Sequence, residues 1–374
     1  MSILDVEKKY TLFIIELLQV ALGIRNGLLR IPSDDEWNNV YKQAAKHGIV
    51  GMLYGGIERL PTVQRPHKGV LIEWFGQAEY YRRMYERQRL AVMRLNGLWR
   101  ADGLKVFELK GDSIGRFYPR PELRYSCDYD CLLSDYEQGN RLVEQQGVEV
   151  NRDFYKNSSF VWEGLHVENH QFCTPVRGNR AMKRLEAVLR RLVVENNTVD
   201  FNALFLMEHL WSHFFEDALT LKQLTDWLVF YKEFNSVVDW QLFEKQAKDC
   251  GFWQFAIVIN KITRNILSSS LLMSDLSESE RRLWQSIMNG GGSIEMNNGW
   301  KTRLQLVGNY FRNGWRYRCY APHGPMFSLL RTGIGYVFDR NPNPSLTLNY
   351  PFFLLSSTLW FSFAVLCTTN FSQS

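Results

Sequence analysis

The sequence predicts an α+β protein in which a small mixed sheet is flanked along the chain by helical regions. Residues 3–24 and 35–60 carry apolar side chains at three- and four-residue steps, which is the period of an amphipathic helix. Residues 104–175 instead contain short apolar runs bounded by glycines, which is typical of strands. Helical periodicity returns between Arg180 and about Ile287.

The N-terminal region is predicted to be a succession of helices. Ser33 is followed by three acidic residues just before the second apolar stripe. This is an N-cap signal, because the serine hydroxyl accepts from a first-turn N–H and carboxylates favour the positive end of a helix. A long helix is expected from about Lys68 to Asp102.

The central region is predicted to hold four strands and one helix. The strands are expected at 104–109, 127–133, 160–162 and 165–170, and the helix at 135–146. Gly147 would end that helix, since glycine adopts the left-handed conformation of a C-terminal cap. Glu163-Gly164 would supply the turn of a hairpin between the last two strands.

Changes of composition divide the chain into four predicted units. They are an N-terminal helical region at 1–102, an α/β core at 103–178, a helical region at 179–288 and a basic-aromatic and apolar region at 289–374. The stretch Asn289-Gly-Gly-Gly-Ser293 marks the last boundary, because glycine-rich stretches form flexible connections.

Composition indicates a folded protein without a strong electrostatic preference. Apolar residues make up 45% of the chain and charged residues 22%. The net charge of +5 gives only a mild attraction to acidic partners such as nucleotides. None of the six cysteines forms a CxxC pair, so a disulfide framework is not expected. The N-terminus mixes charges with a short apolar segment, unlike a signal peptide, and the expected location is cytoplasmic.

Two C-terminal segments have more than one interpretation. Residues 350–367 carry no charge over 18 positions, the lower limit for crossing a bilayer, but four Ser and Thr side chains and Pro351 weaken that interpretation. Membrane association through 350–367 therefore stands beside a buried terminal helix. Residues 300–320 alternate basic and aromatic side chains, as nucleic-acid-binding segments and amphipathic helices both do. The low net charge does not favour nucleic acid.

The stretch Phe107–Leu133 carries the strongest indication of chemistry. Lys110 and Gly111 follow one apolar run, and Asp128 and Asp130 stand one residue apart on the next. Residues i and i+2 of a strand point to the same face, so the two carboxylates are expected side by side. Adjacent carboxylates repel each other unless a cation lies between them, and oxygen ligands suit Mg²⁺ or Mn²⁺. The pattern predicts metal-dependent chemistry on a nucleoside triphosphate.

These residues form part of a longer pattern. Its members are Leu109-Lys110-Gly111, Tyr118-Pro119, Pro121, Arg124, Asp128-Tyr129-Asp130, Val167-Glu168-Asn169-His170 and Leu224-Thr225-Asp226-Trp227. The pattern resembles an uncharacterised bacterial nucleotidyltransferase-like family, a divergent branch of the DNA polymerase β-type nucleotidyltransferase superfamily. The resemblance covers most of residues 30–260, and it implies that the 103–178 unit is a nucleotidyltransferase core.

The resemblance implies metal-binding and catalytic roles for three carboxylates. Asp128 and Asp130 would hold two Mg²⁺ ions. Glu168 would be the third carboxylate, which ligates the catalytic metal and activates the acceptor hydroxyl.

The resemblance also implies contacts with the triphosphate. Gly111 would lie at a strand-to-helix turn where backbone N–H groups approach phosphates, with Ser113 adding a hydroxyl and Lys110 a positive charge. Arg124 would bind phosphate with its rigid fork of donors. The simpler interpretation of Lys110 and Arg124 is that they neutralise the aspartates.

Four further residues have competing interpretations. His170 is predicted to be a packed, hydrogen-bonded strand residue rather than a ligand. His209 and His213 share a helix face, where a zinc site is less favoured than an aromatic-rich helix interface. Asp226 is predicted to have a structural role in the helical region, and the alternative is that it reaches the nucleotide site.

The sequence thus predicts a nucleotidyltransferase that uses Mg²⁺ or Mn²⁺. It would move a nucleotidyl group from a nucleoside triphosphate to a hydroxyl of an unidentified small molecule, peptide or protein. The alternative is a catalytically silent binding or scaffold protein with the same fold, associated with a membrane through its C-terminus.

Overall fold

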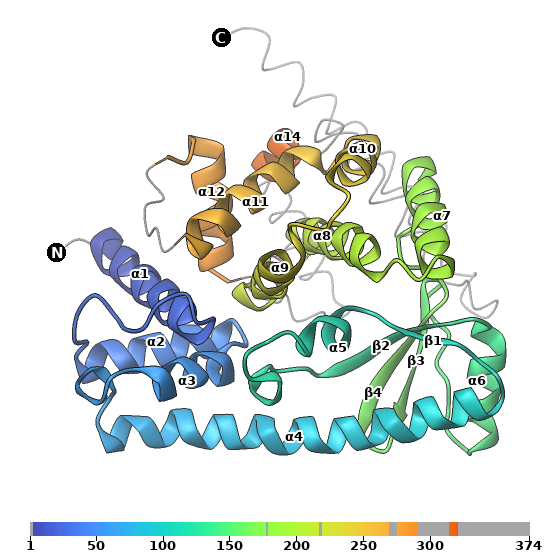
Figure 1. The fold of residues 1–374 in the computed structure, drawn as a ribbon, viewed down its shortest axis with the longest axis horizontal. Helices are drawn as coiled ribbons and strands as arrows, with labels where there is room; N and C mark the ends of the chain where they lie inside the picture. Colours follow the sequence, from blue (N-terminus) through green and yellow to red (C-terminus); the bar gives the residue numbers. More distant parts are fainter. Residues whose placement is uncertain (1–2, 177–178, 217–218, 269–274, 291–313, 321–374) are drawn as a thin grey trace, which may run out of the picture.

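The computed structural model describes residues 3–176, 179–216, 219–268, 275–290 and 314–320 (Figure 1). It confirms the α+β class, because a four-stranded mixed sheet lies among helices. Within the described ranges, no helix combines the length and the apolar character needed to span a bilayer. The segment 350–367 lies outside those ranges, as does most of 300–320.

Four helices precede the sheet. They are α1 (Ile3–Ala21), α2 (Asp34–Lys46), α3 (Val50–Arg59) and α4 (Lys68–Ala101), with a short 3-10 turn, η1 (Thr62–Gln64), before α4. Ser33 and Glu36 form a capping box at the start of α2, which confirms the predicted N-cap. The apolar stripe at 35–60 is two helices rather than one, because Gly48 takes a left-handed φ of +68° between them.

The sheet has the strand order β1-β2-β4-β3. Its strands are β1 (Val106–Glu108), β2 (Asp128–Leu133), β3 (Asn157–Trp162) and β4 (Leu165–His170). β2 and β4 are parallel, whereas β1–β2 and β3–β4 are antiparallel. The predicted hairpin is confirmed, and both turn residues, Glu163 (φ +50°) and Gly164 (φ +80°), have the positive φ of a tight hairpin turn.

Shorter helices connect the strands, and a larger helical region follows them. The connecting elements are α5 (Lys110–Gly115), η2 (Pro121–Leu123) and α6 (Tyr136–Gln145). The later helices are α7 (Arg180–Val194), α8 (Thr198–Glu216), α9 (Leu221–Phe234), α10 (Trp240–Cys250), α11 (Trp253–Leu267), α12 (Glu278–Met288) and α14 (Gly314–Tyr320). In Figure 1, α7 to α14 lie on the side of the molecule opposite α4.

The helix α4 contributes to two separate apolar cores. Its first half packs Trp74 and Tyr81 into a large core shared with α1 to α3 and the later helices. Its second half packs Leu95 and Trp99 into a smaller core beneath the sheet. A helix of 34 residues is about 51 Å long. Figure 1 accordingly shows α4 running beneath both halves of the molecule.

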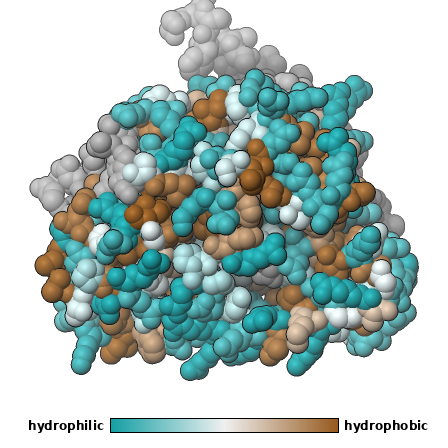
Figure 2. Space-filling model, in the orientation of Figure 1, coloured by the Kyte–Doolittle hydropathy of each residue, from teal (hydrophilic) through white to brown (hydrophobic). Residues whose placement is uncertain are grey.

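The short helix α14 packs on the helical region. Arg316 is only 8% exposed, and its guanidinium donates to the Phe214 carbonyl (2.7 Å) and to Ser286 Oγ (2.8 Å). This arginine of the basic-aromatic segment therefore lies in the protein interior. The face shown in Figure 2 is mainly hydrophilic, and its hydrophobic residues occur in separate patches.

Candidate metal centre

The register of the two parallel strands brings Asp130 and Glu168 together. Asp130 of β2 pairs directly with Glu168 of β4, and two residues further along Leu132 pairs with His170. Alternation along β4 puts His170 on the same face as Glu168. The opposite face of β2 belongs to the smaller core, where the Tyr129 hydroxyl donates to Asn96 Oδ1 (3.0 Å). Tyr129 of β2 therefore packs in the smaller core, and the next residue, Asp130, lies on the opposite face beside Glu168.

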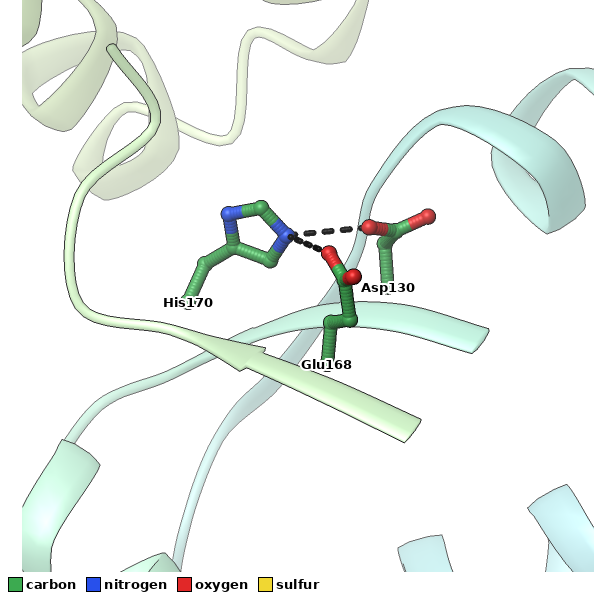
Figure 3. A group of neighbouring side chains, drawn as sticks. All are labelled: Asp130, Glu168 and His170. Carbon is green, nitrogen blue, oxygen red and sulfur yellow. Dashed lines mark hydrogen bonds and ion pairs between the residues drawn. The ribbon is translucent and has the colours of Figure 1, made fainter. Parts of the chain in front are cut away.

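Asp130, Glu168 and His170 form an acidic centre that could hold a metal ion. Their ligand atoms all lie within 4.8 Å of one another, and no other such group of three or more occurs in the part of the chain that the structure describes. His170 Nε2 is 2.9 Å from Asp130 Oδ1 and 3.4 Å from Glu168 Oε2. Figure 3 shows the three side chains converging from the two strands.

Lys110 forms an ion pair with the acidic centre. Its Nζ lies 2.8 Å from Asp130 Oδ1, the same oxygen that faces His170. Burial alone would raise the pKa of the Asp130 carboxyl, but Lys110 and His170 hold it well below its usual range. Burial alone would lower the pKa of Lys110, but Asp130, Glu168 and Asp128 raise it. The centre therefore keeps Asp130 ionised and Lys110 protonated.

Asp128 lies at the start of β2 and is not a member of the three-residue group. Its carboxylate accepts a weak bond from the Cys127 thiol, with Sγ 3.6 Å from Oδ1. It nevertheless adds to the negative field at Lys110. The prediction that Asp128 and Asp130 bind metal together stays a prediction.

The residues expected to contact phosphate form the turn from β1 into α5. Lys110 has a φ of +42°, a conformation that costs a residue with a side chain about 1–2 kcal/mol. Ser113 is buried, and its Oγ donates to the Lys110 carbonyl (2.8 Å) and lies 3.5 Å from Asn202 Oδ1. A Cβ at Gly111 would stand 3.3 Å from Arg124 Nη1. The turn is thus stabilised by a hydrogen bond from a side chain to its own backbone, and it lies close to Arg124.

Arg124 makes a buried clamp with Asp226 and Tyr118. The Arg124 Nε and Nη2 donate to the two oxygens of Asp226, both at 2.8 Å, and the Tyr118 hydroxyl donates to Asp226 Oδ1 at 2.6 Å. Burial alone would raise the pKa of Asp226, but Arg124 and Tyr118 lower it. This clamp fastens the loop before β2 to α9. Asp226 therefore has a structural pairing, but its partners Arg124 and Tyr118 lie outside the helical region in which the pairing was predicted. Phosphate binding by Arg124 stays a prediction.

A histidine pair on α8 lies close enough to the acidic centre for the charges there to affect the pKa of His209. His209 Nε2 and His213 Nε2 are 3.1 Å apart. Burial, together with the positive field of Lys110, holds the pKa of His209 well below its ordinary value. The two rings share a helix face as predicted, among aromatic side chains such as Phe205.

Sequence reasoning underestimated His170. It is buried and hydrogen-bonded, as predicted, but its Nε2 is also one of the atoms that could ligate a metal ion. The signal was present in the sequence, because Glu168 and His170 stand two residues apart on a strand and must share a face. What the sequence did not show was that this face turns toward Asp130.

Comparison with known proteins extends this picture. A family model described as an uncharacterised nucleotidyltransferase matches residues 33–267, from the cap of α2 to the end of α11. That range contains the acidic centre, Lys110 and the whole clamp. No curated protein and no solved structure matches the chain.

Proposed function

Because this chain belongs to the family of uncharacterised nucleotidyltransferases, we propose that it transfers a nucleotidyl group from a nucleoside triphosphate to a hydroxyl acceptor with the help of a divalent metal ion. The observation that carries the proposal is the pairing of Asp130 with Glu168 across two parallel strands, beside Lys110. Such an arrangement would place two metal-binding carboxylates and one phosphate-binding ammonium together on the two inner strands and the turn beside them.

The carboxylates have distinct roles in the proposed reaction. Asp128, Asp130 and Glu168 would hold the metal, which would neutralise charge on the phosphates. The acceptor oxygen forms a bond to the α-phosphorus, the bond from that phosphorus to the β-phosphate bridging oxygen breaks, and pyrophosphate leaves. Glu168 takes the proton of the hydroxyl, because its carboxylate is partly exposed whereas Asp130 is buried and paired.

The turn after β1 serves the phosphates. Lys110 leaves Asp130 and pairs with the triphosphate, while the backbone N–H of Gly111 and the hydroxyl of Ser113 lie beside it. The main role of Arg124 is to keep this turn in place through its pairing with Asp226. Its contact with phosphate is a lesser role.

The finer features of the proposal concern kinship and cellular context. The strand-turn-helix that precedes the Asp-x-Asp strand supports a place in the DNA polymerase β-type superfamily. Membership of a bacterial branch of that superfamily rests on the sequence resemblance alone. The acceptor is a hydroxyl of a small molecule, a peptide or a protein, and the reaction takes place in the cytoplasm.

One observation favours a second candidate, a catalytically silent binding or scaffold protein. Lys110 already neutralises Asp130, so the buried charge is balanced without a metal ion. In a silent protein this ion pair would be permanent, and nucleotide would not displace it.

The first test is thermal unfolding of the full chain with each of ATP, GTP, CTP and UTP, with and without Mg²⁺ or Mn²⁺. A ligand at about 100 times its Kd stabilises the folded state by about 2.7 kcal/mol, a shift of a few degrees. We expect a shift that requires both nucleotide and metal and that disappears in Asp130→Asn. Pyrophosphate release with the best nucleotide then reports turnover.

Asp239→Asn is the matched control for this test. Asp239 is an exposed N-cap of α10, and asparagine caps helices equally well. Its ligand-dependent shift should equal that of the wild type. Absence of any nucleotide shift in the wild type would support the silent alternative and refute the enzyme.

A further inference from the structure

Both ring nitrogens of His170 face oxygen atoms that can only accept hydrogen bonds. Nδ1 lies 3.3 Å from the carbonyl oxygen of Phe172, and Nε2 faces the carboxylates of Asp130 and Glu168. The Phe172 carbonyl requires the ring proton on Nδ1. In the neutral ring, the Nε2 lone pair then points directly at two anionic oxygens. The three groups therefore offer one nitrogen and carboxylate oxygens as ligand atoms to a cation that binds among them.

The position of the ring is fixed by burial and by the pairing of its strand. His170 is 2% exposed and ends a strand that is paired on both sides. Metal-binding histidines are held in the same way, with the second nitrogen donating to a carbonyl oxygen that fixes the tautomer. The separations of 2.9 and 3.4 Å also suit ligands of one ion, because metal–ligand bonds of about 2.0–2.2 Å leave ligand atoms roughly 3–4 Å apart.

We propose that Asp130, Glu168 and His170 hold one divalent first-row transition-metal ion through two carboxylate oxygens and His170 Nε2, and that this centre prefers such an ion to Mg²⁺. Imidazole nitrogen is a good ligand for first-row transition ions, whereas Mg²⁺ selects oxygen and retains water. The inference deepens the proposed function by naming the class of metal, and it rests on that function only for what the metal does.

Lys110 opposes the ion at the same oxygen. Its Nζ is 2.8 Å from Asp130 Oδ1, so the ammonium has to move away when the ion binds. Removing this positive charge while keeping an unbranched side chain, as in Lys110→Met, therefore strengthens metal binding by about tenfold or more. This variant reports on the centre even if a His170 variant folds poorly.

The decisive experiment uses the nucleotide-free full chain, freed of metal by a chelator and titrated with MnCl₂. Electron paramagnetic resonance counts free Mn²⁺, and its spin-echo modulation reveals a directly coordinated ¹⁴N nucleus. We expect one bound Mn²⁺ per chain with a nitrogen coupling. In His170→Asn the coupling should vanish and the affinity should fall by at least about tenfold. Mg²⁺ should fail to displace Mn²⁺ at equal concentration.

His67→Asn is the matched histidine control. His67 is exposed and caps α4, a position that asparagine also fills. It should keep the nitrogen coupling and the affinity. Bound Mn²⁺ without a nitrogen coupling, displacement by equimolar Mg²⁺, or no gain in Lys110→Met would each overturn the proposal.

Failure of this inference is separable from failure of the proposed function. Nitrogen-coupled Mn²⁺ without any nucleotide-dependent thermal shift would keep the metal centre and remove the transferase. A nucleotide shift that needs Mg²⁺, with no nitrogen coupling to Mn²⁺, would keep the transferase and remove the histidine ligand.

Discussion

His47 is a buried side chain that joins the N-terminal helices to the later ones. Its Nε2 donates to the Met288 carbonyl (3.0 Å), and its Nδ1 accepts from the Leu221 N–H (3.3 Å). A neutral ring satisfies both bonds, whereas a second proton would leave the Leu221 N–H without its acceptor. Burial accordingly lowers the pKa of His47 from 6.5 to about 4.

We expect this histidine to make folding sensitive to acid. Between pH 6.5 and 4 the unfolded chain binds the His47 proton and the folded chain does not, so the free energy of unfolding falls as the pH falls through this window. The loss from this residue is about 3 kcal/mol at the lower end. Urea unfolding of wild type and His47→Gln at several pH values measures it. An equal pH dependence in both proteins would contradict the assignment.

The clamp of Arg124 gives a second prediction at the same scale. Asp226→Asn leaves a buried guanidinium without its counter-charge and should cost about 3–5 kcal/mol of stability. The double variant Arg124→Met, Asp226→Leu removes both charges. It should lose much less stability than the sum of the losses in the single variants Arg124→Met and Asp226→Leu. A double-mutant cycle in urea checks this, and additive losses would show that the two side chains act independently.

The helix α3 packs closely against its neighbours at Gly51. A Cβ added to Gly51 would stand 2.4 Å from the Leu123 carbonyl oxygen and 2.5 Å from Tyr81 Cδ2. By contrast, a Cβ at Gly76 of α4 would meet no atom within 4 Å. The same residue type therefore serves close packing in one helix and has no packing role in the other.

Opposite effects of one substitution follow from this contrast. Gly51→Ala should destabilise the protein by about 1–3 kcal/mol, because backbone must move to admit the methyl group. Gly76→Ala should stabilise it by about 0.5–1 kcal/mol through helix propensity alone. Chemical denaturation of the two variants measures both changes in the free energy of unfolding. If both variants were more stable, helix propensity would decide at both sites, and if both were less stable, packing would.

Sequence patterns predicted the elements well where the signal is local. The strands, the hairpin turn and α4 follow from periodicity, glycine and capping signals within a few residues. The split between α2 and α3 was missed because the apolar stripe continues past Gly48, whose backbone conformation interrupts the helix.

The candidate site was less accessible from the sequence. Alternation places Asp130, Glu168 and His170 on consistent faces of their strands, but only the register shows that the three meet. Arg124 and Asp226 are 102 positions apart, and no local pattern links them. Long-range pairing of side chains is a property of the packed chain rather than of its periodicity.

At the scale of the whole molecule, α4 connects the two cores. Its exposed middle residue Arg87 lies between the part that packs in the large core and the part that packs beneath the sheet. Arg87→Pro would remove a helical hydrogen bond and kink α4 there, at a cost of about 3 kcal/mol or more. Calorimetry should show one transition in wild type and in Arg87→Ala, but two in Arg87→Pro, since each core then unfolds by itself. A single transition in Arg87→Pro would mean that other contacts couple the cores.

The contact between the first and the later helices has a consequence for synthesis on the ribosome. Gln19 of α1 donates to the Ile266 carbonyl, 247 residues further along the chain. At a translation rate of roughly 5–20 residues per second, Ile266 is synthesised about 12–50 seconds after Gln19. During this interval the part of α1 that packs against α11 faces solvent, the ribosome or a chaperone. The nascent protein is therefore exposed to aggregation and proteolysis until its last described helices emerge.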